Sequence, residues 1–119
     1  MGKVSITING SEVKNIYPAA TIGVSAAACG DEVIFFILPN ALPIFIGDKI
    51  KELNEAAPKS PDLEEMWDGL KMLGAQVLVC ELGFDVHGLK QEDLIDGCEV
   101  VGATTFVARA QGSNLTFSF

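Results

Sequence analysis

The chain carries three cysteines, Cys29, Cys80 and Cys98, and their chemistry is the first that the sequence offers. An odd number at wide spacing gives neither a disulfide framework nor the paired spacing of a zinc site. Cys80 alone closes a short apolar run, residues 76–80, that is typical of a buried strand. Functional groups in open α/β sheets gather where the strands end, so Cys80 is the candidate nucleophile.

A nucleophilic role requires that the thiolate form of Cys80 be favoured. A helix over residues 82–87 would place unpaired backbone N–H groups beside the sulfur and favour the anion. The thiolate, not the thiol, is the form of cysteine that attacks as a nucleophile. Glu81 and Asp85 act in the opposite direction, because nearby carboxylates disfavour a second negative charge. The alternative is that Cys80 is a small buried hydrophobic residue, as free cysteines often are.

Two other predicted strands end in turn-forming residues, and the ends of parallel strands meet at one edge of a sheet. We therefore expect the candidate site to include residues from these turns and from the segment after Cys80, namely Gly10, Ser11, Pro39, Asn40, Glu81, Leu82 and Gly83.

The remaining thiols and the single histidine are weaker candidates. Cys29, at a predicted helix end, and Cys98, near a predicted strand start, are expected to pack in the protein. Either could resolve a bond formed on Cys80 only if folding brought the two sulfurs together. His87 would lie roughly 10 Å along the helix axis from Cys80, too far for direct base catalysis, so we expect a surface histidine.

The segment 39–45 is unusually apolar for a loop. Loops normally run over the surface, so its apolar residues predict a contact between subunits through Leu42, Ile44 and Phe45. The alternative is that the segment folds onto the core of its own subunit.

Hydrophobic patterns predict strands and helices that alternate along a single domain, residues 1–119. The strands are expected at residues 4–8, 33–38, 76–80, 99–101 and 114–119, and the helices at 17–29, 44–57, 61–73, 82–87 and 103–110. Such alternation is typical of an α/β fold with a mostly parallel sheet and helices on both faces.

Composition limits the classes of function. The net charge is −8 and the isoelectric point about 4.4, which disfavours binding to nucleic acid or to anionic membranes. The longest apolar stretch, residues 33–46, is too short for a membrane span and contains two prolines. The chain starts without a signal-peptide pattern, so we expect a cytoplasmic protein. No pattern predicts a metal site or an organic cofactor.

The segment from Cys80 to Leu89, followed by residues 91–97, resembles the DsrE/DsrF-like (DsrEFH) family. In that family a strand ends in cysteine, and a helix of one to two turns, a glycine–hydrophobic pair and an acidic Glu-Asp-Leu-Ile phrase follow. Residues 101–103 are similar to the start of its last helix, and residues 26–36 to its helix-to-strand passage. The similarity runs from about residue 18 to the end of the chain.

This resemblance implies a three-layer α/β/α sandwich with a five-stranded sheet that assembles into trimers or hexamers, either alone or with paralogues. It implies that the cysteine at the place of Cys80 receives persulfide sulfur from a donor protein and passes it to an acceptor protein. Glu81 and Leu82 depart from the Ser and Met that often follow this cysteine.

Two hypotheses follow, and the sequence does not decide whether the chain is an enzyme. The first is a sulfur carrier or sulfurtransferase that acts through Cys80. The second is a non-catalytic oligomeric binding module of the same fold with a structural Cys80. The first predicts a thiol open to solvent, and the second predicts a thiol enclosed by aliphatic neighbours.

Overall fold

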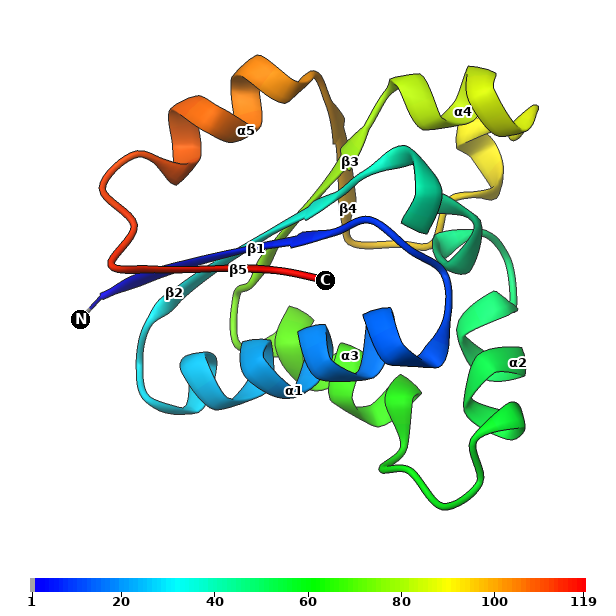
Figure 1. The fold of residues 1–119 in the computed structure, drawn as a ribbon, viewed down its shortest axis with the longest axis horizontal. Coiled ribbons are helices and arrows are strands. Elements are labelled where there is room, and N and C mark those ends of the chain that lie inside the picture. Colours follow the sequence, from blue (N-terminus) through cyan, green and yellow to red (C-terminus); the bar gives the residue numbers. More distant parts are fainter. Residues whose placement is uncertain (1) are drawn as a thin grey trace.

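In the computed structural model, which describes residues 2–119, strands and helices alternate around one sheet (Figure 1). In chain order the elements are β1 (Lys3–Ile8), α1 (Val13–Ala28), β2 (Glu32–Ile37), the 3-10 helix η1 (Pro39–Phe45), α2 (Lys49–Ala56), α3 (Leu63–Met72), β3 (Gln76–Cys80), α4 (Leu82–His87), the 3-10 helix η2 (Gln91–Asp93), β4 (Cys98–Val101), α5 (Ala103–Ala110) and β5 (Leu115–Ser118). The strands are ordered β4-β3-β2-β1-β5, and each neighbouring pair is parallel. The predicted α/β fold with a mostly parallel five-stranded sheet is therefore confirmed.

The helices lie on both sides of the sheet. Figure 1 shows α1 and α3 together below one face, and α5 above the other, with α4 beyond the end of β3 on the same side as α5. This arrangement gives the three layers that the sequence led us to expect. Among residues 2–119, no helix combines the length and the hydrophobicity that crossing a bilayer demands.

The structure differs from the prediction between β2 and α3. A helix over residues 44–57 was expected after an apolar loop, but η1 continues to Phe45 and α2 begins only at Lys49. Pro43 lacks the backbone N–H that a continuous α-helix would need. Gly47 then takes a φ of +55°, a left-handed turn that separates the two helices.

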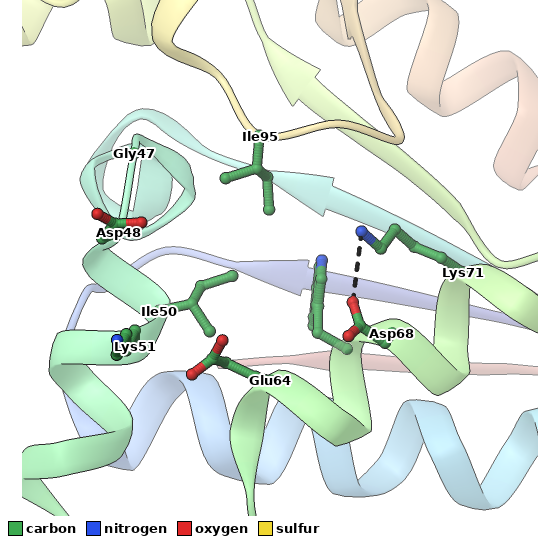
Figure 2. A pocket seen from close by; sticks show the side chains of 9 residues that line it. Gly47, Asp48, Ile50, Lys51, Glu64, Asp68, Lys71 and Ile95 are labelled. Atoms are coloured by element: carbon green, nitrogen blue, oxygen red, sulfur yellow. Dashed lines mark ion pairs between the residues drawn. The ribbon is translucent and has the colours of Figure 1, made fainter.

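The start of α2, the helix α3 and the loop before β4 leave a small cavity between them. Its volume is about 150 Å³, and Figure 2 shows residues from all three segments around it, including Ile50, Asp68 and Ile95. This cavity lies on the α1/α3 side of the sheet, away from Cys80.

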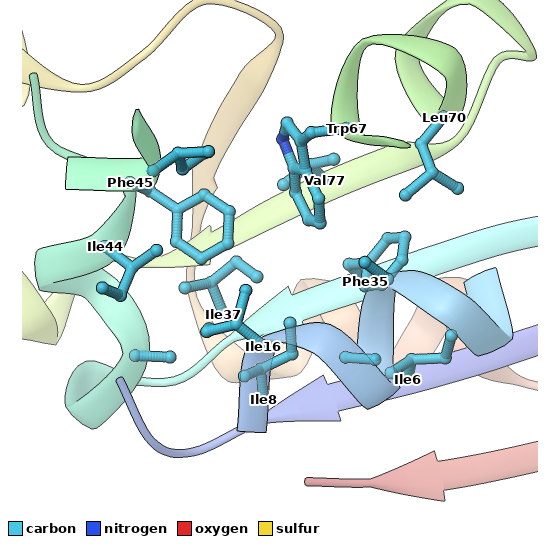
Figure 3. Close-up of a cluster of buried hydrophobic side chains, with 14 of the residues drawn as sticks. Ile6, Ile8, Ile16, Phe35, Ile37, Ile44, Phe45, Trp67, Leu70 and Val77 are labelled. Carbon is cyan, nitrogen blue, oxygen red and sulfur yellow. The ribbon is translucent and has the colours of Figure 1, made fainter. Parts of the chain in front are cut away.

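The main hydrophobic core fills the space between the sheet and the α1/α3 layer. Trp67 of α3 lies at its centre, with ring centroids 5.2 Å from Phe35 and 5.0 Å from Phe45 (Figure 3). Tilted aromatic contacts of this kind add to the free energy gained from area burial. Phe45 of η1 therefore belongs to the core of its own subunit.

A smaller cluster lies on the opposite face of the sheet. Its buried members come from three strands, and they are Ile34, Phe36, Leu78, Cys80 and Val101. The helix α5 covers them through Phe106, whose ring stacks on Phe36 at a centroid distance of 4.6 Å. Cys80 is thus on the α5 face of the sheet.

The contact between α1 and the sheet is testable at Gly23. A Cβ at this position would lie 2.4 Å from Cζ of Phe35 and 3.3 Å from Cδ2 of Leu70. We expect Gly23→Ala to lower the free energy of unfolding by roughly 1–3 kcal/mol, the usual effect of overpacking a filled core. Urea denaturation with linear extrapolation measures the change.

Gly69 of α3 provides the matched control, because a Cβ there meets no atom within 4 Å. Gly69→Ala is expected to raise the free energy of unfolding by about 0.5–1 kcal/mol, since alanine restricts the unfolded chain and favours the helix. Equal effects of the two substitutions would contradict the close approach of α1 to Phe35.

Candidate functional site

Three strand ends meet at the carboxyl edge of the sheet, as parallel strands require. The turn after β1 contacts the segment after β2, because the Ser11 hydroxyl donates a hydrogen bond to the carbonyl of Asn40. The start of α4 packs on η1, since a Cβ at Gly83 would lie 2.8 Å from Leu42 Cδ2 and 3.2 Å from Pro39 Cα. The structure therefore brings the predicted site segments to one edge.

Cys80 is the last residue of β3 at this edge, and it is only 4% exposed. Its neighbours in the α5-face cluster are apolar, and Val101 is its partner in the parallel ladder with β4. The cavity between α2, α3 and the loop before β4, and three further cavities beside α1, are lined by other residues. The open thiol that the carrier hypothesis predicts is therefore not found in this structure, and the enclosed thiol of the alternative is. The reason is that Val101 and α5 continue the apolar cover over the end of β3.

Two helices begin beside Cys80. The helix α4 starts two residues after it, and α5 starts after Gly102, the residue that follows Val101. Helix N-termini carry partial positive charge and favour a nearby anion. The Glu81 carboxylate is already close to the start of α5, since its Oε1 would lie 3.5 Å from a Cβ at Gly102. Any thiolate at Cys80 shares this positive region with Glu81.

Neither of the other thiols faces Cys80. Cys98 pairs with Val77 in the same ladder in which Cys80 pairs with Val101, and residues three apart in a strand point to opposite faces. Cys98 lies near Lys71 of α3 on the far side of the sheet; burial raises its pKa to about 11, while Lys71 lowers the pKa and Asp96 raises it. Cys29 is exposed at the end of α1. No second thiol is therefore positioned to resolve a disulfide with Cys80 among residues 2–119.

His87 is the last residue of α4 and is exposed. It lies a full helix length from Cys80 along the chain, which agrees with the surface position expected from the sequence. The histidine therefore adds no base to the candidate site.

The apolar segment 39–45 does not form the exposed subunit contact that the sequence suggested. Leu42 and Phe45 are 0% exposed and Ile44 is 8% exposed. The segment turns inward as the 3-10 helix η1, so its apolar side chains join the core of the same chain. The alternative reading, a loop folded onto its own core, is the correct one for these three residues.

The residues that fasten α5 over the Cys80 face were not identified from the sequence. Arg109 of α5 donates two hydrogen bonds to the Glu99 carboxylate of β4, at 2.9 and 2.8 Å, and a third to Gln76 at 3.3 Å. Lys3 donates to the Arg109 and Gln111 carbonyls at the end of α5. The hydrogen bonds from Arg109 lower the pKa of Glu99, and Glu99 in turn raises the pKa of Arg109.

This ion pair predicts a pH-dependent contribution to stability. Because the folded-state pKa of Glu99 lies below its usual 4.5, the pair stabilises the fold above pH 4.5 and loses its effect as the pH falls through the folded-state pKa. Glu99→Gln should therefore melt at a lower temperature than wild type at pH 7, and the difference should shrink below pH 4.5. The difference is expected to be small, as for other exposed pairs.

Thermal denaturation by circular dichroism from pH 7 to pH 3 measures this change. Glu55→Gln is the matched control, because Glu55 is exposed on α2 and has no ion pair among the described residues. A melting difference for Glu99→Gln that stays constant with pH would show that the pair does not hold α5 in place.

The sequence and the fold of this chain are similar to those of known proteins. Residues 45–117, more than half of the 119-residue chain, match the DsrE/DsrF/DrsH-like family. The crystal structure of the ychN protein from E. coli is similar over 100% of both chains, with a TM-score of 0.78 and 16% identity. MTH1491 from Methanobacterium thermoautotrophicum, described as a protein of unknown function, has a TM-score of 0.75 and 13% identity over 98% of this chain and 99% of its own. At these identities the two structures show a shared fold alone, and no curated protein matches the sequence. The matched segment contains Cys80, both helices that begin beside it and the Arg109–Glu99 pair, and the chain belongs to the DsrE/DsrF/DrsH-like family.

Proposed function

We propose that this chain is a sulfur carrier that accepts sulfane sulfur on Cys80 and passes it to a partner protein. The observation that supports the proposal most is the place of Cys80 in the family segment, at the end of β3 beside the starts of α4 and α5. A strand-end thiol next to two helix N-termini has the electrostatic surroundings that a thiolate carrier needs.

The reaction requires no metal or organic cofactor. The Cys80 thiolate attacks the terminal sulfur of a donor persulfide, forming a new S–S bond while the donor S–S bond breaks. The donor leaves as a thiolate and takes up a proton, so no net oxidation occurs. Transfer to the acceptor repeats the exchange in the other direction, with the acceptor thiolate attacking the outer sulfur and Cys80 leaving.

The burial of Cys80 sets a condition on this reaction. Because the thiol is 4% exposed, the donor must displace part of its cover before it can reach the sulfur. The helix α4 is six residues long, and its Leu82 and Val86 are 62% and 66% exposed. These two side chains lie one helical turn apart and form a small exposed apolar patch on α4, the helix that follows Cys80. A donor protein that docks on this patch would displace α4 and uncover the thiol.

The same burial favours a second candidate function, a non-catalytic binding or scaffolding module. In that case Cys80 contributes only its packing against Phe36, Leu78 and Val101, as buried free cysteines commonly do. The assembly of the chain with copies of itself or with paralogues would then be its role. The cytoplasmic location and the trimeric or hexameric state remain part of both proposals.

Sulfur loading tests the carrier proposal directly. After incubation with glutathione persulfide and removal of the excess, the intact mass of wild type is expected to rise by about 32 Da, the mass of one sulfur atom. Cys80→Ala should show no such rise, while Cys29→Ser, which removes the exposed thiol, should retain it. An adduct that survives in Cys80→Ala would assign the chemistry to another thiol and overturn the proposal.

Native alkylation separates the two candidate functions. The rates at which iodoacetamide modifies the three cysteines at pH 8 are measured by quenching and peptide mass analysis. Cys29 is exposed and supplies the fast reference, and Cys98, whose pKa burial raises to about 11, supplies the slow one. A carrier predicts that Cys80 reacts at least about tenfold faster than Cys98. Reaction of Cys80 only at the rate of global unfolding would support the structural role.

A further inference from the structure

The strand β5 forms one edge of the sheet and carries no charged side chain. Among residues 2–119 it pairs only with β1, and all of its residues except Phe117 are exposed (Figure 1). The chain contains 8 Lys and Arg and 16 Asp and Glu residues, yet none of them lies within residues 110–119. Proteins usually block a free sheet edge with a charged side chain or a proline, because an open edge pairs with other strands. The edge at β5 is therefore open to a further strand.

The opposite edge of the sheet is blocked in this way. Its strand β4 carries Glu99, whose carboxylate is bound by Arg109 of α5, and Asp96 lies just before the strand. Charged side chains at an edge discourage pairing with another chain. The absence of charge at β5 is thus a property of that edge and not of the whole sheet.

The backbone groups of β5 alternate between the sheet and the free edge. The Phe119 N–H donates a hydrogen bond to the Thr7 carbonyl of β1. Backbone groups of residues two apart in a strand point to the same side, so those of Phe117 also face β1. The N–H and C=O groups of Thr116 and Ser118 therefore point away from the sheet. Two donors and two acceptors are free there to form a ladder.

The side chains of the same strand line an apolar groove beside α1. The rings of Phe117 and Phe119 have centroids 6.4 Å apart, and they border a cavity of about 540 Å³ that no charged residue lines. A second cavity of about 200 Å³ shares Ile22 and Phe117 with the first and also contacts Leu115, which is 55% exposed. A continuous apolar surface next to an open strand edge is typical of a protein contact.

We propose that β5 pairs with β5 of a second copy of this chain, antiparallel about a twofold axis beside Phe117. A twofold axis perpendicular to the sheet makes two identical edges run in opposite directions. Thr116 of each copy then exchanges both backbone hydrogen bonds with Ser118 of the other, so all the free groups find partners. Phe117 lies opposite Phe117 of the second copy, and facing aromatic side chains stabilise a strand pair.

A second copy suits this edge better than an unrelated strand does. The register centred on Phe117 is self-complementary, and it keeps the α1 sides of both sheets together, so the two apolar grooves meet beneath the Phe117 rings. The chain has a net charge of −8, so copies repel each other except where charge is absent, as it is along β5. A hexamer of two trimers contains such a twofold axis and a lone trimer does not. The proposal does not depend on sulfur transfer, because Cys80 ends β3, three strands away.

Cysteine cross-linking tests the register. In a Cys29→Ser background, which lacks the exposed native thiol, Phe117→Cys places two sulfurs across the axis. Opposed residues without mutual hydrogen bonds have Cα atoms about 4.5 Å apart, within the range of roughly 4.4–6.8 Å for disulfides. Oxidation with copper phenanthroline should convert most of this variant into a covalent dimer on a non-reducing gel. Thr116→Cys is the matched control and should stay monomeric on the gel, since its two Cα atoms would lie roughly 9 Å apart.

Sedimentation tests the edge without replacing an aromatic residue. Thr116→Pro removes one outward N–H and leaves the ladder with β1 intact, as prolines on edge strands do. Thr116→Ala is the matched control, because it keeps that N–H. Wild type and Thr116→Ala should sediment at an even multiple of the 12.6 kDa chain mass, and Thr116→Pro at half the mass of wild type. Far-UV circular dichroism checks that each variant is folded.

Three results would overturn the proposal. Wild type that sediments at the mass of a monomer or of a lone trimer has no twofold axis at β5. A folded Thr116→Pro with the mass of wild type would place the contact elsewhere. Equal cross-linking of Phe117→Cys and Thr116→Cys would exclude the register centred on Phe117. Sulfur loading of Cys80 in the same variants reports on the carrier proposal separately, since neither substitution lies on β3.

Discussion

A parallel sheet buries apolar side chains on both faces, and in this chain one of those faces depends on a single eight-residue helix. The α1/α3 face has the large core around Trp67, whereas α5 covers the other face mainly through the stack of Phe106 on Phe36. The Arg109–Glu99 pair and the Lys3 hydrogen bonds fix the far end of α5 to strands β4 and β1. These few contacts hold the cover over Cys80 closed.

The thin cover over Cys80 is compatible with either of the two proposed functions. In the closed structure Cys80 is a packing residue, enclosed by Phe36, Leu78 and Val101. Yet the elements around it are the short helix α4 and the four-residue edge strand β4, and short elements with few buried contacts open at the lowest free energy. In the proposed carrier, local opening at this edge would therefore be what exposes the thiol.

The sequence predicted the elements better than it predicted exposure. The strand order along the chain, the helix at residues 82–87 and the parallel sheet followed from local patterns, because periodicity and glycine stops are local properties. The burial of Cys80 did not follow, since it depends on Val101 and α5, which are distant in sequence. The predicted subunit contact through Leu42, Ile44 and Phe45 was wrong for the same reason, because an apolar segment has the same sequence pattern whether it turns outward or inward. The hydrogen bonds of Arg109 to Glu99 and Gln76 could not be predicted either, because only folding brings α5 beside the start of β3 and β4.

The edge strand β4 has its two ends on opposite faces of the sheet, and only one end covers Cys80. Cys98, at the start of β4, points toward Lys71, whereas Val101, at its end, pairs with Cys80. Because residues three apart in a strand face opposite sides, this four-residue strand presents Cys98 to the α3 face and Val101 to the α5 face. Cys98 is therefore part of the strand whose last residue covers Cys80, whereas Cys29 lies exposed at the end of α1. For this reason the exposed thiol of Cys29, and not the buried one of Cys98, is the sound control for chemistry at Cys80.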